Sequence, residues 1–169
     1  MSTQVTVNTY VYSVTYVTDK MLTSLLNIIR WIGLDPGRFT DNWAGTEAAV
    51  KTWLNSQHLT GVVLEVFNPR TNALLTRWDV DVDYGYSLGT EGSMWVDTDA
   101  IRYAILKAGQ LPSACDYRVV IITKPGRPDV LGWSPTTLRS TDGFVRYVVG
   151  TTIGTNPIGA QTAYWRKTQ

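Results

Sequence analysis

The feature that most constrains the fold is a pair of strand-forming segments in the middle of the chain, separated by turn-forming residues. Residues 62–67 read VVLEVF and residues 74–82 read LLTRWDVDV, and Asn68-Pro69-Arg70-Thr71-Asn72 lies between them. Val and Trp favour strands, whereas Asn and Pro favour turns. The pattern predicts an antiparallel β-hairpin with a loop of about five residues. The fold must therefore accommodate an antiparallel sheet.

The amino-terminal part of the chain predicts an extended segment followed by a helix. Residues 4–17 (QVTVNTYVYSVTYV) are rich in Val, Thr and Tyr, which favours extended structure. Thr18 or Asp19 can then cap a helix whose apolar residues recur at helical spacing. We expect this helix to end before Pro36, because the residue preceding a proline resists the helical conformation.

Two further helices and one further strand are predicted downstream. One helix is expected to begin near Thr40 and to bury one face. The other is expected to begin after Asp97, whose carboxylate can cap it, and to end at Gly109. Residues 117–123 (YRVVIIT) form a continuous β-branched run, which predicts a buried strand.

Residues 125–169 differ in composition from the rest of the chain. They contain four prolines and six glycines, and only residues 144–149 within them predict a strand. Large aromatic residues are spread through the same segment, which is not typical of a solvated, disordered tail. We therefore expect a single domain of residues 1–169, with a core of residues 1–124 and an ordered arm of residues 125–169 that wraps it.

The distribution of charge along the chain is uneven. The formal net charge of the 169 residues is +1. Residues 1–100 carry 6 basic and 11 acidic side chains, a net charge of −5, while residues 101–169 carry 9 and 3, a net charge of +6. A polybasic nucleic-acid-binding protein would have a different overall balance. The basic, aromatic arm nevertheless leaves a single-stranded nucleic-acid-binding domain open as an alternative function.

Three aspartates at alternate positions are the strongest candidates for catalysis. Residues two apart on a strand share a face, so Asp79, Asp81 and Asp83 could together hold Mg²⁺ in a metal-dependent enzyme. The same alternation is ordinary for a half-exposed strand in which Trp78, Val80 and Val82 face the core and the aspartates face water. We adopt the second interpretation and keep the first as an alternative.

The remaining candidates for chemistry are weak. His58 is the only histidine and is expected in a loop at a helix end. Cys115 is the only cysteine, which excludes an internal disulfide and a multi-cysteine zinc site. The adjacent Asp116 should raise the thiol pKa of Cys115 and oppose a reactive thiolate. We therefore expect no enzyme activity, no catalytic residue, no metal and no cofactor.

Neither the amino terminus nor any apolar stretch suggests export or membrane insertion. The first ten residues, MSTQVTVNTY, contain no cationic stretch and no apolar run. The longest apolar stretch, around residues 22–34, is interrupted by Asn27 and Arg30 and is too short to span a bilayer. The expected location is the cytoplasm, without a membrane partner.

Several collinear strings resemble the HORMA domain and, more narrowly, its bacterial branch. They lie before the first helix, around the hairpin and through the arm: SVTYVTD at 13–19, Asn68-Pro69, TRWD at 76–79, TKPGRPD at 123–129, GWS at 132–134, RSTDG at 139–143 and YWR at 164–166. The resemblance covers essentially the whole chain. It implies an α+β fold, a small and mostly antiparallel sheet backed by three helices, with residues 125–169 as a carboxy-terminal safety belt.

The resemblance implies a signalling module rather than an enzyme. HORMA proteins in the closed form trap a short peptide, the closure motif, between the sheet and the safety belt. Bacterial members resemble components of CBASS anti-phage systems, in which the closed form activates a cyclic-oligonucleotide synthase of the CD-NTase class. A AAA+ ATPase of the pachytene-checkpoint type reverses closure by pulling on the HORMA amino terminus. A pairing with a second HORMA protein stays open.

The resemblance also implies positions for the binding residues. The expected peptide contacts are Val119, Val120, Ile121, Ile122, Phe144, Val145, Tyr147 and Val148. The residues expected to latch the belt are Trp133, Arg139 and Trp165. The expected ATPase handle is the amino-terminal segment, with Ser2, Thr3, Val5 and Val7. If charge holds the basic belt on the acidic core, raised salt should loosen it and speed proteolysis after Lys124.

Overall fold

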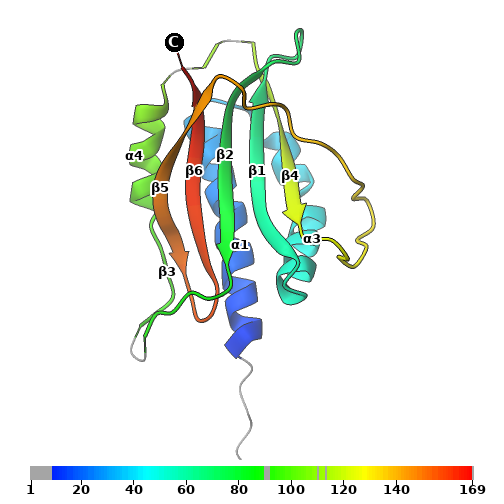
Figure 1. The fold of residues 1–169 in the computed structure, drawn as a ribbon, viewed down its shortest axis with the longest axis vertical. Helices are drawn as coiled ribbons and strands as arrows, with labels where there is room; N and C mark the ends of the chain where they lie inside the picture. The colour runs from blue at the N-terminus through cyan, green and yellow to red at the C-terminus, as the bar shows by residue number, and fades with distance from the viewer. Residues whose placement is uncertain (1–8, 90–91, 110, 113, 169) are drawn as a thin grey trace, which may run out of the picture.

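The computed structural model describes residues 9–89, 92–109, 111–112 and 114–168. One six-stranded antiparallel sheet, in the order β3-β5-β6-β2-β1-β4, is backed by helices on one face (Figure 1). The helices are α1 (Thr9–Trp31), α2 (Gly37–Asp41), α3 (Trp43–Asn55) and α4 (Thr98–Ala108). The strands are β1 (Leu59–Phe67), β2 (Leu74–Asp83), β3 (Trp95–Val96), β4 (Asp116–Thr123), β5 (Phe144–Gly154) and β6 (Gly159–Lys167).

The mixed α and β architecture confirms the predicted fold class, with the short α2 in addition to three longer helices. In Figure 1, α1 lies behind the centre of the sheet, α3 behind the β1 and β4 side, and α4 beside β5. The core lies between the helices and the facing side of the sheet, where Leu25, Leu64 and Trp78 are fully buried. We call the opposite side of the sheet the outer face. Among the helices of the described ranges, none combines the length and the hydropathy of a membrane span.

The extended structure predicted for residues 4–17 is wrong from Thr9 onward, because α1 begins there. The predicted cap at Thr18 or Asp19 therefore lies inside the helix. Val14 and Val17 belong to the buried face of α1. The β-branched residues lower helix propensity by only a few tenths of a kcal/mol each, roughly, and burial of one helix face outweighs that cost.

The two other predicted helices are confirmed, although one of them is divided into two. The helix predicted near Thr40 is split into α2 and α3. The Asp97 carboxylate accepts a hydrogen bond from the Ala100 backbone N–H at 3.0 Å and caps α4. Gly109, with a φ of +88°, ends α4 in a conformation that favours glycine.

The predicted hairpin is confirmed as β1 and β2, with Leu64 opposite Trp78. The prediction of a single strand in the arm is wrong, because residues 144–167 form two strands, β5 and β6, and β6 pairs with β2 from Thr76 to Asp83. Sequence analysis missed β6 because its residues 159–163 (GAQTA) have low strand propensity. The β5–β6 hairpin is thus part of the sheet, and the segment of residues 124–143 is what wraps the core. We call residues 124–143 the crossing segment.

The strand predicted at residues 117–123 exists as β4, but the prediction that it is buried is wrong. It pairs with β1 alone and forms one edge of the sheet, and most of its residues are only half-buried. Its apolar residues have a further packing partner beside β1 and the core, because the crossing segment lies against the strand.

Candidate functional site

Two adjoining cavities lie between β4 and the crossing segment. One has a volume of about 460 Å³ and extends along residues 118–123 of β4, with Trp53, Pro135 and Leu138 among its lining residues. The other has a volume of about 610 Å³ and lies at the Asp116 end of β4, where α2 and the start of α3 also line it. Trp133 of the crossing segment lines both. The edge of β4 therefore borders one long space of mixed polar and apolar lining.

The outer edge of β4 presents unpaired backbone groups to this space. The backbone N–H of Lys124 donates to the His58 carbonyl at 2.7 Å, on the β1 side. Because backbone groups of alternate residues point to opposite sides of a strand, Ile122 and Val120 also face β1, and Val119 and Ile121 face the open edge. Within the described part of the chain, no other strand pairs with this edge.

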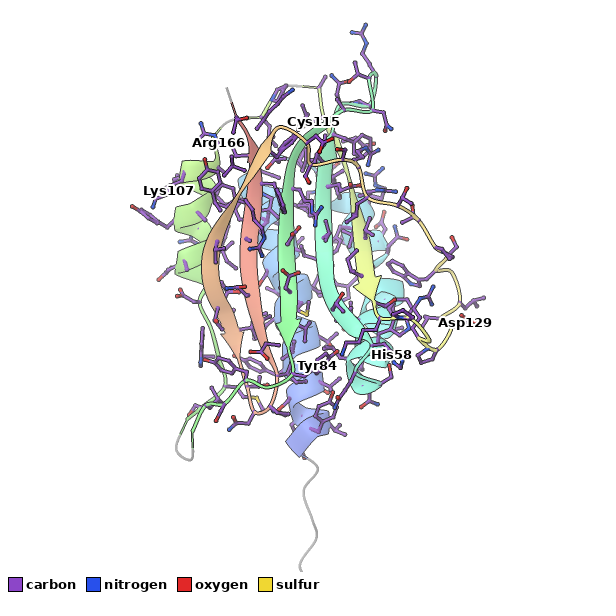
Figure 2. The ribbon with its side chains drawn as sticks, viewed as in Figure 1. His58, Tyr84, Lys107, Cys115, Asp129 and Arg166 are labelled. Atoms are coloured by element: carbon purple, nitrogen blue, oxygen red, sulfur yellow. The ribbon has the colours of Figure 1, made fainter. Side chains whose placement is uncertain are left out.

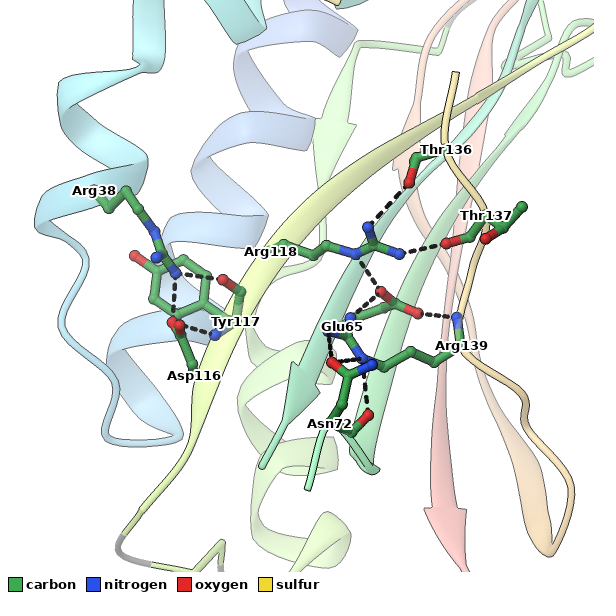
Figure 3. A network of polar contacts seen from close by, with 9 residues as sticks. All are labelled: Arg38, Glu65, Asn72, Asp116, Tyr117, Arg118, Thr136, Thr137 and Arg139. Carbon is green, nitrogen blue, oxygen red and sulfur yellow. Dashed lines mark hydrogen bonds and ion pairs between the residues drawn. The ribbon is translucent and has the colours of Figure 1, made fainter. Parts of the chain in front are cut away.

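A buried carboxylate on β1 fastens the crossing segment over the outer face (Figure 3). The Glu65 side chain is 0% exposed, and its Oε1 accepts hydrogen bonds from Arg118 Nε at 2.5 Å and Arg139 Nη1 at 2.8 Å. Its Oε2 accepts the backbone N–H of Arg139 at 2.6 Å. Arg118 also donates to the Thr136 hydroxyl and the Thr137 carbonyl. Strands β1 and β4 and the crossing segment thus share one polar cluster.

Arg139 was predicted to latch the belt, whereas sequence analysis missed Glu65 and Arg118. Arg139 makes further contacts with the Asn72 carbonyl and side chain, and its guanidinium lies 3.6 Å from the Phe67 ring centroid. A signal for Glu65 existed, because it is the one charged residue in the apolar run VVLEVF. The partner of Glu65 could not be predicted, because it depends on the register of β1 and β4, which places Arg118 directly opposite Glu65.

A second set of contacts fastens the crossing segment to α3. The ring of Trp133, predicted to latch the belt, packs edge-on against Trp53 at a centroid distance of 6.2 Å, and its Nε1 donates to the Gly45 carbonyl at 3.3 Å. The Trp53 Nε1 donates to the Pro128 carbonyl at 2.7 Å, and Arg127 lies over the Trp53 ring. The crossing segment is therefore held on both sides of the β4 edge.

Trp165, the third predicted latch residue, lies on β6 and not in the crossing segment. Its Nε1 donates to Asp79 Oδ2 at 3.0 Å, and the Arg77 guanidinium contacts the same carboxylate and lies over the Trp165 ring. Arg146 of β5 donates to Asp81 at 3.2 Å. These contacts hold the β5–β6 hairpin against β2.

The three aspartates of β2 do not share one environment. Asp79 is buried, which contradicts the prediction that it faces water, whereas Asp83 is exposed. Burial, and then the neighbouring Asp79, raises the pKa of Asp81. In the ranges that the structure describes, no group of three or more histidine, cysteine or acidic residues is arranged to hold a metal ion. The magnesium alternative therefore has no support from the geometry.

The two halves of the predicted peptide contact do not come together. Val119, Val120, Ile121 and Ile122 lie on β4 beside the two cavities. The other four residues lie on β5, which is separated from β4 by β6, β2 and β1: Phe144, Val145, Tyr147 and Val148. One extended peptide on the β4 edge therefore cannot also pair with β5. The predicted ATPase handle, Ser2, Thr3, Val5 and Val7, lies outside the described residues.

His58 and Cys115 lie near opposite ends of the sheet (Figure 2), so they cannot form a nucleophile and base pair. His58 Nδ1 contacts the Ser56 hydroxyl at 2.9 Å. Burial raises the pKa of the Cys115 thiol, and the nearby Asp116 raises it further. The direction agrees with the prediction, although burial is the larger cause.

Three cations of the basic arm are used inside the molecule. Arg139 pairs with Glu65 and Arg146 with Asp81, and Arg127 lies 3.9 Å from Asp129. These ion pairs neutralise much of the positive charge that binding to nucleic-acid phosphates would require, which disfavours the nucleic-acid-binding alternative.

The comparisons with known proteins agree with this geometry. A family model described as Bacterial HORMA domain 2 matches residues 2–168. Among solved structures, a chain of the mitotic checkpoint complex has a TM-score of 0.74 at 11% identity, covering 93% of this chain and 99% of that chain. C. elegans HTP-1 bound to the HIM-3 closure motif has a TM-score of 0.69 at 11% identity, covering 91% and 89%.

A bacterial structure shares the fold as well. The E. coli MS115-1 CdnC:HORMA-deltaN complex contains a chain with a TM-score of 0.61 at 12% identity, covering 100% of this chain and 94% of that chain. No curated protein matches the sequence. At these identities the solved structures establish the fold, and the family model establishes membership over nearly the whole sequence. The chain therefore belongs to the bacterial HORMA domain 2 family.

Proposed function

We propose that this protein is a peptide-binding switch in which a closure-motif peptide adds as a further strand to the open edge of β4. The observation that carries the proposal is the pair of cavities between that edge and the crossing segment. Backbone hydrogen bonds to an exposed sheet edge give affinity, and side-chain pockets give selectivity. The structure of C. elegans HTP-1 bound to the HIM-3 closure motif supports closure-motif binding by a chain of this fold.

The energy that such a switch needs is within reach of a short peptide. Moving a population from 1:99 to 99:1 requires a preference of about 5.5 kcal/mol for the closed form. Backbone hydrogen bonds contribute about 1 kcal/mol each, and a fully buried apolar side chain about 1.5–3 kcal/mol. A few backbone hydrogen bonds and two buried side chains are sufficient to supply this preference.

The signalling partner that we propose is a CD-NTase, within a CBASS anti-phage system. The support is the family and the CdnC:HORMA-deltaN complex, which joins a relative of the same fold to CdnC. The peptide-bound form would activate synthesis of a cyclic oligonucleotide, and a AAA+ ATPase of the pachytene-checkpoint type would reset the switch through residues 2–7. A second HORMA protein is a further candidate partner, and the proposed location is the cytoplasm.

The first test is peptide capture by the wild-type protein. A random 12-residue display library is selected on the protein, and the Kd of the best peptide is measured by fluorescence anisotropy. Ile121→Pro removes one N–H from the open edge without removing a bond to β1. It should weaken binding at least tenfold, while Thr151→Pro, on the distant β5, serves as the matched strand variant and should keep the wild-type Kd. Failure to select any peptide would refute the proposal.

The second test concerns the synthase. CdnC of the E. coli MS115-1 complex, or a nucleotidyltransferase encoded beside this gene where there is one, is assayed for cyclic-oligonucleotide synthesis with the free protein and with the protein saturated with the selected peptide. We expect stimulation by the saturated form. Equal synthesis in both cases would remove the CD-NTase part of the proposal and leave peptide capture intact.

A further inference from the structure

We call the N–H and C=O that one residue presents to the open edge of β4 a backbone rung. The rung next to Val119, at Tyr117, is already bonded to side chains (Figure 3). The Tyr117 carbonyl accepts a hydrogen bond from Arg38 Nη2 of α2. The Tyr117 N–H donates to Asp116 Oδ1 at 2.7 Å, and Arg38 Nη2 donates to the same oxygen at 2.5 Å. Both backbone groups that Tyr117 presents to the open edge therefore have partners, unlike those of Val119 and Ile121 in the part of the chain that the structure describes.

The occupied rung is held in place from several directions. The Arg38 guanidinium lies 4.8 Å from the Tyr117 ring centroid, and the Tyr117 hydroxyl donates to the Asp35 carbonyl at 2.7 Å. The Arg38 bond to Asp116 lowers the pKa of that carboxyl, so the pair stays charged at neutral pH. A peptide must break charge-assisted hydrogen bonds to reach this rung.

We propose that Arg38 and Asp116 form a stop that ends the pairing of a bound peptide at Val119. The peptide then pairs only with residues 119–123, a stretch of about five residues. Its next residue leaves the sheet and places its side chain in the 610 Å³ cavity, which begins at this end of β4. This inference rests on the proposed function and specifies the ligand: a short strand with a residue of defined chemistry beyond the end that lies at Val119.

The lining of the cavity favours a large apolar side chain at that position. Phe39, Phe67 and Trp133 are among its walls. Leu131, also in the lining, is 101% exposed and would lose that exposure when a side chain filled the space. The charges of the two lining arginines are already paired with Asp116 and Glu65, respectively. Asp41 also lines the cavity and makes no ion pair among the described residues. Its negative charge disfavours an acidic residue in the ligand.

The experiment is an N-methyl scan of the display-selected peptide. Methylating a peptide N–H that pairs with β4 should weaken binding about fivefold or more, the equivalent of one net hydrogen bond. In the wild type, sensitive positions should alternate within a window of about five residues. In the Arg38→Met/Asp116→Ala variant, which frees both groups of Tyr117, the window should lengthen by one alternate position.

Controls separate the stop from general damage. Arg30→Ala, which removes an exposed arginine at the end of α1, should leave the window unchanged. In the free protein, the Tyr117 amide should exchange hydrogen more slowly than the Val119 and Ile121 amides, and Asp116→Ala should abolish that difference without unfolding the chain.

The cavity residue is tested on the same peptide. The first peptide residue beyond the Val119 end of the window is replaced with Asp, which should weaken binding more than tenfold compared with Leu or Phe at that position. The protein variant Leu131→Asp should reduce the preference for Leu and Phe. A wild-type window that already extends through Tyr117, or one that the double variant leaves unchanged, overturns the stop. Absence of any selected peptide overturns the proposed function itself, so the two failures are distinguishable.

Discussion

The buried Glu65 cluster predicts a large cost for a nearly isosteric substitution, Glu65→Gln. The wild-type carboxylate accepts three hydrogen bonds, from Arg118, the Arg139 side chain and the Arg139 backbone. Whichever way the substituted glutamine side chain is turned, its amide nitrogen would face a donor, so at least one of these bonds must be lost and its donor left unpaired. Charge-assisted bonds contribute about 1.5–3 kcal/mol each.

From these contacts we expect Glu65→Gln to lower the free energy of unfolding by about 3 kcal/mol, at the lower end of the range for a broken buried ion pair. For a chain of this length that corresponds to a decrease in Tm of about 6–12 °C. Chemical denaturation measures the first quantity and calorimetry the second. Trypsin cleavage within the crossing segment should become more than tenfold faster at the Arg139–Ser140 bond; Lys124 and Arg127 are each followed by a proline, which trypsin does not cleave.

The matched control is Asp129→Asn, which neutralises an exposed carboxylate of the same segment and should change the unfolding free energy by less than about 0.5 kcal/mol. Salt provides a second check. Because Glu65 is fully buried, raising the ionic strength should affect its cluster less than the pair of half-buried Arg127 and exposed Asp129. Stability within about 0.5 kcal/mol of wild type, with the Arg139 amide still protected from exchange, would refute the reasoning.

Three further outcomes follow from other contacts. Trp133→Ala should speed proteolysis of the crossing segment and weaken peptide binding at least tenfold, with Trp31→Ala as the control that leaves binding unchanged. Asp81→Asn should match or exceed wild-type stability at pH 7, because burial raises the pKa of Asp81 and its ionised form is disfavoured in the fold; denaturation at pH 3, where the wild-type carboxyl is protonated, should show no such gain. Cys115 should react with iodoacetamide at pH 8 more slowly than free cysteine, because burial raises its pKa, and Asp116→Ala should partly restore the rate.

The elements that depend on local signals were predictable. The β1–β2 hairpin has strand formers on both sides of a turn, and α4 has an acidic cap and a terminal glycine. The errors arose where tertiary packing outweighs propensity. Residues 9–17 resemble a strand in composition but bury one helix face, and β6 has a weak strand sequence but gains two partners, β2 and β5.

The site was predictable only in part. The apolar run of β4 indicated a strand of functional interest, and Trp133 and Arg139 indicated a fastened belt. The position of the β5 residues relative to β4 depends on strand order, which local patterns do not determine. Glu65, Arg118 and Arg38 acquire their roles through residues 53 to 79 positions away in the sequence, such as Arg118 for Glu65 and Tyr117 for Arg38.

The crossing segment also has a kinetic consequence. It joins β4 to the β5–β6 hairpin, and β6 is bonded to β2, so chain and sheet together form a closed ring around the space at the β4 edge. A bound strand with bulky ends could not leave this ring sideways. Its residence time would then be determined by how often β6 separates from β2, so two peptides of very different affinity could dissociate at similar rates.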